Sequence, residues 1–125
     1  MHRSTLTAVL ADVPRECFTD EIAFWSGALG SPPVIDDADP DYAELGRAGH
    51  GVQFMVQRIG GPARFHLDIE TDDIDAEVAR LEALGARRVV HVQTWWVMRD
   101  PAGLLFCVVR VQPGSDFDSV ATRWD

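Results

Sequence analysis

The feature that most constrains the fold is an order of elements that occurs twice. In each half of the chain, a segment rich in strand-forming residues precedes an amphipathic segment, which closes with Ala-Leu-Gly at residues 28–30 and again at 83–85. A glycine that follows an apolar helical pattern commonly ends a helix. About three further strand-like segments follow each of these endings. The sequence therefore predicts an internal duplication of a strand, a helix and about three strands.

Hydrophobic periodicity gives approximate bounds for these elements. Apolar residues three and four apart predict one helix that ends at Gly30 and a second helix over about 74–84, whereas alternation predicts strands. The expected strands are 5–11, 42–47, 51–58, 65–71, 87–93, 95–99 and 104–111. We expect a single domain, 1–125, with module one at about 4–58, a linker at 59–64, module two at about 65–111 and a polar tail at 112–125. In that tail, Phe117 and Trp124 would anchor the chain, either on the domain itself or on a second chain.

Charge and cysteine content exclude several classes of function. The net charge of −9 argues against binding to nucleic acid or to an anionic membrane, because both require a basic surface. No apolar run approaches the roughly 18 residues of a membrane span, and the N-terminus lacks a secretory leader pattern. Cys17 and Cys107 have no metal-binding or redox spacing. We therefore expect a cytoplasmic protein with reduced thiols, whose partner is a small molecule.

Alternation along the predicted strands separates a face toward the helices from a second face. On 65–71, Phe65, Leu67 and Ile69 are expected to pack on a helix, which leaves the opposite face to His66, Asp68 and Glu70. The other residues expected on the helix side are Leu6, Ala8, Leu10, Val52, Phe54, Val56, Phe106 and Val108, and those expected opposite are Thr5, Thr7, Val9, Gln53, Met55, Gln57, Cys107 and Val109. This second face mixes polar and apolar groups, which suits a ligand pocket. A solvated sheet face is the alternative.

Three stretches of the chain carry a resemblance to a known family. They are residues 12–30, residues 66–86 (HLDIETDDIDAEVARLEALGA) and residues 95–109, where Asp-Pro-Ala-Gly precedes the last strand. Together they resemble the vicinal oxygen chelate superfamily, which has the glyoxalase and bleomycin-resistance fold. The resemblance implies an α+β fold in which two βαβββ modules form a curled mixed sheet around a cavity, with the helices outside. It also implies a homodimer.

The resemblance further implies where a metal would bind. Metal-dependent members hold a divalent ion with His and Glu side chains, and the four corresponding positions here are Thr5, Gln57, His66 and Cys107. His66 alone keeps a usual ligand type. We therefore expect no metal cofactor of the usual kind, with a rebuilt divalent-metal site as the alternative. Asp68 or Glu70 would then replace missing ligands.

The candidate site residues follow from the polar face. His66 with Asp68 or Glu70 would transfer protons, because an imidazole beside a carboxylate can act as a general acid or base. Cys107 is either a nucleophile or an inert core thiol. One of the adjacent Trp95 and Trp96 would pack beneath a helix, and the other would stack on a ligand. The residues expected to bind the ligand are Thr5, Thr7, Gln53, Met55, Gln57, Trp95, Trp96 and Cys107.

Three functions remain open from the sequence. The first is a glyoxalase-like small-molecule protein, possessing lyase or isomerase activity if it is an enzyme, in which the usual metal ligands are mostly absent. The second is a non-catalytic protein that sequesters an antibiotic or a metabolite, similar to bleomycin-resistance proteins. The third is a metal-dependent lyase or dioxygenase with altered ligands. The sequence does not decide whether the protein is an enzyme.

Overall fold

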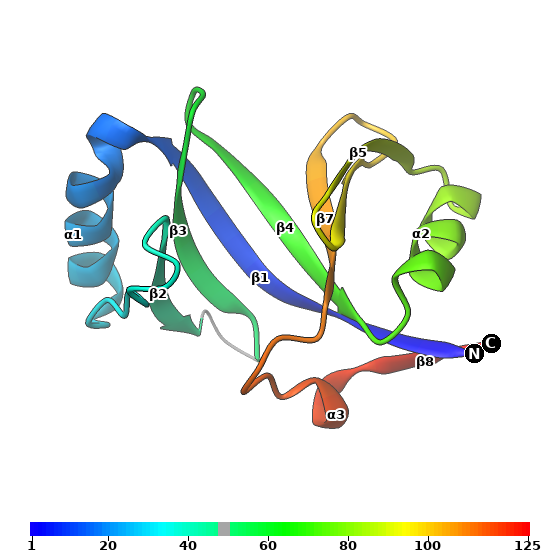
Figure 1. The fold of residues 1–125 in the computed structure, drawn as a ribbon. Coiled ribbons are helices and arrows are strands. Elements are labelled where there is room, and N and C mark those ends of the chain that lie inside the picture. Colours follow the sequence, from blue (N-terminus) through cyan, green and yellow to red (C-terminus); the bar gives the residue numbers. More distant parts are fainter. Residues whose placement is uncertain (48–50) are drawn as a thin grey trace. The chain divides into compact units, whose positions relative to one another are not determined.

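A computed structural model describes residues 1–47 and 51–125 (Figure 1). The elements are β1 (His2–Pro14), η1 (Arg15–Cys17), α1 (Phe18–Leu29), β2 (Tyr42–Arg47), β3 (Gln53–Ile59), β4 (Arg64–Thr71), α2 (Ile74–Ala83), β5 (Arg87–Val92), β6 (Trp95–Arg99), β7 (Leu105–Arg110), α3 (Phe117–Val120) and β8 (Thr122–Trp124). Over residues 1–47 and 51–125 the strands form an eight-stranded mixed sheet, which confirms the α+β class. In the described ranges, no helix is long and apolar enough to cross a membrane.

The chain forms two compact units, and the N-terminal unit comprises Ala8–His66. Its strands follow the order β2-β3-β1-β4, in which β1 and β3 are parallel and β2 and β3 are antiparallel. One face of this sheet packs on α1 (Figure 1). The buried core residues are Ala11, Val13, Phe18, Ile22, Ala43, Leu45, Phe54 and Val56, with Val9 and Trp25 packed against them. This core leaves the even-numbered residues of β1 on the sheet face opposite α1.

The C-terminal unit comprises Met1–Thr7 and Leu67–Asp125. Its strands follow the order β1-β4-β7-β6-β5, with β4 and β7 parallel and the last three strands antiparallel. Val78 of α2 is fully buried against Met98, Phe106 and Val108, and this cluster forms the core of the unit. The predicted order of a strand, a helix and three strands is confirmed here.

The tail is part of the fold. Phe117 is 2% exposed, and β8 pairs antiparallel with His2–Ser4 of β1, so that both termini lie at one end of this unit (Figure 1). The indole of Trp124 donates a hydrogen bond of 2.8 Å to the hydroxyl of Ser4. The prediction that Phe117 and Trp124 anchor the tail is therefore confirmed.

The predicted faces are wrong on β1 and on part of β4. On β1 the core contains Ala11 and Val13, with Val9 packed against it, whereas Leu10 is in register with Met55 on the opposite face. Apolar residues lie on both faces of this strand, so alternation carried no signal. On β4, Ile69 packs on the core as predicted, but Phe65 is 61% exposed and Leu67 40% exposed. Leu6, also expected on the helix side, is 42% exposed.

The start of α2 is fixed by a side chain. Asp73 accepts a hydrogen bond of 3.0 Å from the backbone N–H of Ala76, which satisfies a donor that the first helical turn leaves open. We expect Asp73→Ala to lower the free energy of unfolding by about 1 kcal/mol. Asp75→Ala, in the same turn but outside the cap, is the control in urea unfolding. Equal losses in the two variants would contradict the capping role.

Candidate functional site

An aspartate and a histidine are in contact on the face of the N-terminal unit opposite α1. His66 Nδ1 lies 2.6 Å from Asp12 Oδ2, and the two residues are 8% and 0% exposed. The guanidinium of Arg64 donates from Nε to the same carboxylate oxygen at 3.1 Å. β1 supplies Asp12 between the core residues Ala11 and Val13, and the first residues of β4 supply Arg64 and His66. We call Asp12 and His66 the buried dyad.

The dyad fixes the orientation and the tautomer of the imidazole. An ionised carboxylate accepts hydrogen bonds and donates none, so the short contact places the proton of neutral His66 on Nδ1. The lone pair then lies on Nε2. An imidazole held in this way by a carboxylate serves as a general base in hydrolases and as a ligand in metal sites. The arrangement is therefore competent for proton transfer or for metal coordination.

Three of the predicted ligand-binding residues share this face. Gln57 is the register partner of Asp12, and Gln53 and Met55 alternate with the core residues Phe54 and Val56 along β3. The amide of Gln57 donates a hydrogen bond of 2.9 Å to the hydroxyl of Tyr42. This contact orients the Gln57 side chain beside the dyad.

The remaining predicted site residues belong to the C-terminal unit. Asp68 is the register partner of Cys107, and both are partly buried. Trp96 packs against the core beneath α2, whereas Trp95 alternates to the other face of β6. Thr5 and Thr7 are partly buried on β1, and Val109 is partly buried on β7.

Glu70 has a different environment from Asp68. It is 1% exposed, and its carboxylate accepts hydrogen bonds from the backbone N–H of Gln112 at 3.0 Å and from the hydroxyl of Ser115 at 2.5 Å. Each of the two oxygens thus holds the chain that leaves β7. These bonds favour a structural role for Glu70 and leave Asp68 as the carboxylate on β4 nearest in sequence to His66.

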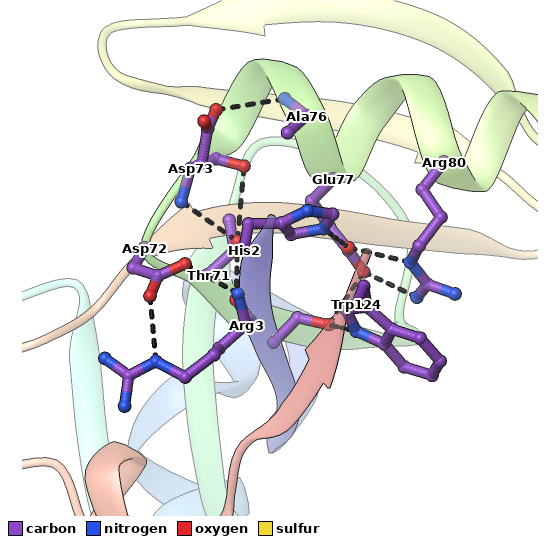
Figure 2. A network of polar contacts seen from close by, with 10 residues as sticks. His2, Arg3, Thr71, Asp72, Asp73, Ala76, Glu77, Arg80 and Trp124 are labelled. Carbon is purple, nitrogen blue, oxygen red and sulfur yellow. Dashed lines mark hydrogen bonds and ion pairs between the residues drawn. The ribbon is translucent and has the colours of Figure 1, made fainter.

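A second buried carboxylate, which the sequence did not single out, lies in the C-terminal unit. Glu77 of α2 is 0% exposed, and its oxygens accept from His2 at 2.5 Å, Ser4 at 2.9 Å and Arg80 at 2.8 and 2.9 Å (Figure 2). Arg80 also stacks on the ring of Trp124, 3.8 Å from its centroid. Burial by itself raises the pKa of Glu77, but the hydrogen bonds from Arg80, His2 and Ser4 outweigh it and lower that pKa below its usual value. This network joins α2 to both ends of the chain.

A hollow in the N-terminal unit is separate from the dyad. It has a volume of about 580 Å³ and lies where β1 ends and β3 turns toward β4. It is lined by Pro14, Arg15, Glu16, Asp41, Arg58, Ile59, Gly60, Gly61 and Pro62. None of the predicted site residues lines this hollow.

A comparison with models of known protein families shows to which family the chain belongs. The profile of the Glyoxalase-like domain matches residues 9–109. The chain belongs to this family. The match confirms the resemblance to the vicinal oxygen chelate superfamily, and it includes all three members of the group formed by Asp12, Arg64 and His66.

Solved structures with the glyoxalase-like fold include proteins of several activities. The Mn(II)-bound glyoxalase from Novosphingobium aromaticivorans is 26% identical, with a TM-score of 0.58 over 88% of this chain and 40% of that one. Methylmalonyl-CoA epimerase from Mycobacterium tuberculosis is 19% identical, with a TM-score of 0.60 over 86% and 88% of the two chains. A structure described as an NAD-dependent benzaldehyde dehydrogenase from Legionella pneumophila has a TM-score of 0.65 at 13% identity, over 84% and 98%. A search of curated proteins finds no match.

The chain retains donors that suit a divalent metal ion. His66 and Asp68 lie two residues apart on β4, and Cys107 is next to Asp68 in register on β7. Imidazole, carboxylate and thiolate are the usual ligands of zinc and of related ions. The contact with Asp12 gives His66 the outer carboxylate that metal-bound histidines commonly have. Asp68 with Cys107 in the C-terminal unit, and His66 with its outer carboxylate in the N-terminal unit, are thus each of a kind that binds a metal ion.

Asp12 is the site residue that the sequence reasoning missed. Asp12 and Asp73 each lie shortly before a helix, but only Asp73 caps one. Asp12 lies within β1 instead, in the apolar run Val9–Val13, where an unpaired charge would be costly. A carboxylate in such a run is the signal that could have identified it.

Proposed function

We propose that this glyoxalase-like protein is an enzyme that moves a proton on a small carbonyl compound, as a lyase or an isomerase does. The observation that carries this proposal is the 2.6 Å contact between Asp12 and His66, with both side chains buried. His66 Nε2 takes the proton from carbon and returns it, because Asp12 keeps the other ring nitrogen protonated. Asp12 also stabilises the imidazolium while the proton resides on His66.

A neighbouring residue has a supporting role in this proposal. Gln57, the register partner of Asp12, donates a hydrogen bond that orients the carbonyl compound beside His66. Glu70 is left out of the proton transfer, because Gln112 and Ser115 occupy its carboxylate.

A divalent metal ion is compatible with the same proposal. His66 would be one of its ligands, and when bound the ion would polarise the carbonyl oxygen as a Lewis acid. The Mn(II)-bound glyoxalase among the similar structures supports this reading. The homodimer and the cytoplasmic location stay predictions, and sedimentation of the purified protein would test the first of them.

Solvent exchange tests the proposed activity without knowledge of the natural substrate. The protein is incubated in D2O with hemithioacetals of 2-oxoaldehydes and with acyl thioesters, and loss of the proton next to the carbonyl is followed by ¹H NMR. The exchange assay is run both with a chelator and with added Mn²⁺ or Zn²⁺. The wild-type protein is expected to catalyse exchange on at least one compound, and His66→Gln to lose it.

The matched control for this experiment is His91→Gln. His91 is exposed on β5, stacks on Trp96 at 4.9 Å and lies outside the proposed machinery. The His91→Gln variant should catalyse exchange of the substrate proton at the wild-type rate. Exchange that survives in His66→Gln, or its absence across the whole panel under all metal conditions, would overturn the proposal.

A further inference from the structure

We propose that Arg64 recognises a carboxylate on the substrate, so that the substrate class is a small carbonyl compound that carries an acidic group. This inference rests on the proposed function for its setting, because it assigns Arg64 to the same site as His66.

The guanidinium is anchored at one nitrogen. Arg64 Nε donates at 3.1 Å to Asp12 Oδ2, the same oxygen that contacts His66 at 2.6 Å. Arg64 and His66 are two residues apart on β4, so their side chains lie on one face of that strand. The guanidinium of Arg64 therefore lies beside the imidazole of His66, the proposed general acid and base.

The outer edge of this guanidinium is available. The side chain of Arg64 is 50% exposed, and among the described residues neither of its Nη atoms has a hydrogen-bond partner. The other described arginines that pair with carboxylates bind differently. Each of them engages an Nη atom, as Arg3, Arg58, Arg80 and Arg88 do with Asp118, Asp41, Glu77 and Glu82. Arg64 thus keeps a free donor edge in a protein whose net charge is −9.

A carboxylate is the ligand that fits such an edge. A guanidinium presents parallel N–H groups that match the two oxygens of a carboxylate, and a fixed guanidinium loses little freedom when it binds. Asp12 holds the guanidinium of Arg64 in place through Nε, so that the edge with the two Nη atoms is already oriented for a ligand. The overall negative charge of the chain would otherwise repel an anion, which makes a local cation necessary for this class of substrate.

The carboxylate of Asp12 supplies an independent observation, a buried acceptor that can receive one more donor. Both donors to Asp12 contact Oδ2, whereas Oδ1 is buried with no hydrogen-bond partner among the described residues. A buried acceptor in that state is costly, and such groups in native structures normally receive a donor from water or from a ligand. Asp12 Oδ1 can therefore accept a hydrogen bond from water or from a donor group of a ligand that binds beside Arg64 and the dyad.

Titration with a simple dicarboxylate tests the inference. Malonate and its uncharged analogue malonamide are added to the full-length protein at constant ionic strength, and the imidazole signals of His66 are followed by NMR. Malonate is expected to shift these signals at millimolar concentration and malonamide is not. Arg64→Gln should bind malonate about tenfold more weakly or worse, as expected for loss of a charged hydrogen-bonded pair.

Two variants control this titration. Arg15→Gln removes an exposed arginine at the separate hollow and should leave malonate binding unchanged. Arg64→Lys keeps the charge but loses the planar fork, and should recover only part of the affinity. Equal affinity for malonate and malonamide, or wild-type affinity in Arg64→Gln, would overturn the inference.

The exchange assay separates this inference from the proposed function. Each compound is offered as a neutral form and as a form that bears a carboxylate. If exchange depends on His66 but not on the carboxylate or on Arg64, the recognition role fails and the proposed function stands. If malonate binds through Arg64 while exchange is independent of His66, the proposed function fails and anion recognition stands.

Discussion

Glu77→Ala is expected to lower the free energy of unfolding by about 3 kcal/mol, the magnitude that follows when one partner of a buried ion pair is removed. The reason is that Glu77 is fully buried and its carboxylate is the common acceptor for His2, Ser4 and Arg80 (Figure 2). Its removal leaves the donors of β1 without a partner and a cavity beside Val78. Urea unfolding followed by tryptophan fluorescence measures the loss.

Glu82→Ala is the matched control for Glu77. It lies on the same helical segment and also binds an arginine, Arg88, but its side chain is 37% exposed. Water can solvate both partners of such a pair, so we expect much less destabilisation. Similar losses in the two variants would show that burial of Glu77 is not what makes its network important.

The carboxylate of Glu77 should also account for part of the loss of stability at acidic pH. The pKa of Glu77 is lower in the folded protein than its ordinary value of about 4.3. A lowered folded pKa means that the stabilisation is fully present above the unfolded value and is lost as the pH falls through the folded one. The unfolding free energy should therefore decline below about pH 4, and Glu77→Gln should flatten that decline. An unchanged slope in this variant would contradict the assignment.

The fold was accessible from the sequence because its signals are local. Helix periodicity and the glycines after each helix fixed α1 and α2, and alternation located most strands within a few residues. Which residues of β1 face the core could not be predicted from the sequence. Val9, Leu10 and Ala11 are all apolar, and only tertiary packing distinguishes them. The expected cavity between modules stays a prediction.

The candidate site was predictable only in part, for a physical reason. His66 is marked by its position in an alternating strand, and the sequence placed it correctly on the face away from the core. Its partner Asp12 lies 54 residues earlier on a different strand, and no local pattern joins the two. The network around Glu77 is equally non-local, since it joins α2 to residues at the beginning and the end of the chain.

Asp12→Asn is expected to lower the rate of His66-dependent exchange by about 10²–10³-fold, within the usual contribution of general acid–base catalysis. The asparagine amide can present an N–H group toward Nδ1, which favours the tautomer with its proton on Nε2. The lone pair that would accept the substrate proton is then lost, although the imidazole remains in place. NMR of ¹⁵N-labelled His66 reports the tautomer directly, and kcat/KM for exchange reports its consequence.

The double variant distinguishes this role from a general loss of structure. If Asp12 acts only through His66, Asp12→Asn combined with His66→Gln should be no slower than His66→Gln alone, because residues that act as a unit are not additive. Asp41→Asn, which removes a charge that pairs with Arg58 outside the site, should exchange at the wild-type rate. A wild-type rate in Asp12→Asn, or strictly additive losses in the double variant, would mean that the buried contact holds the sheet together without directing the proton.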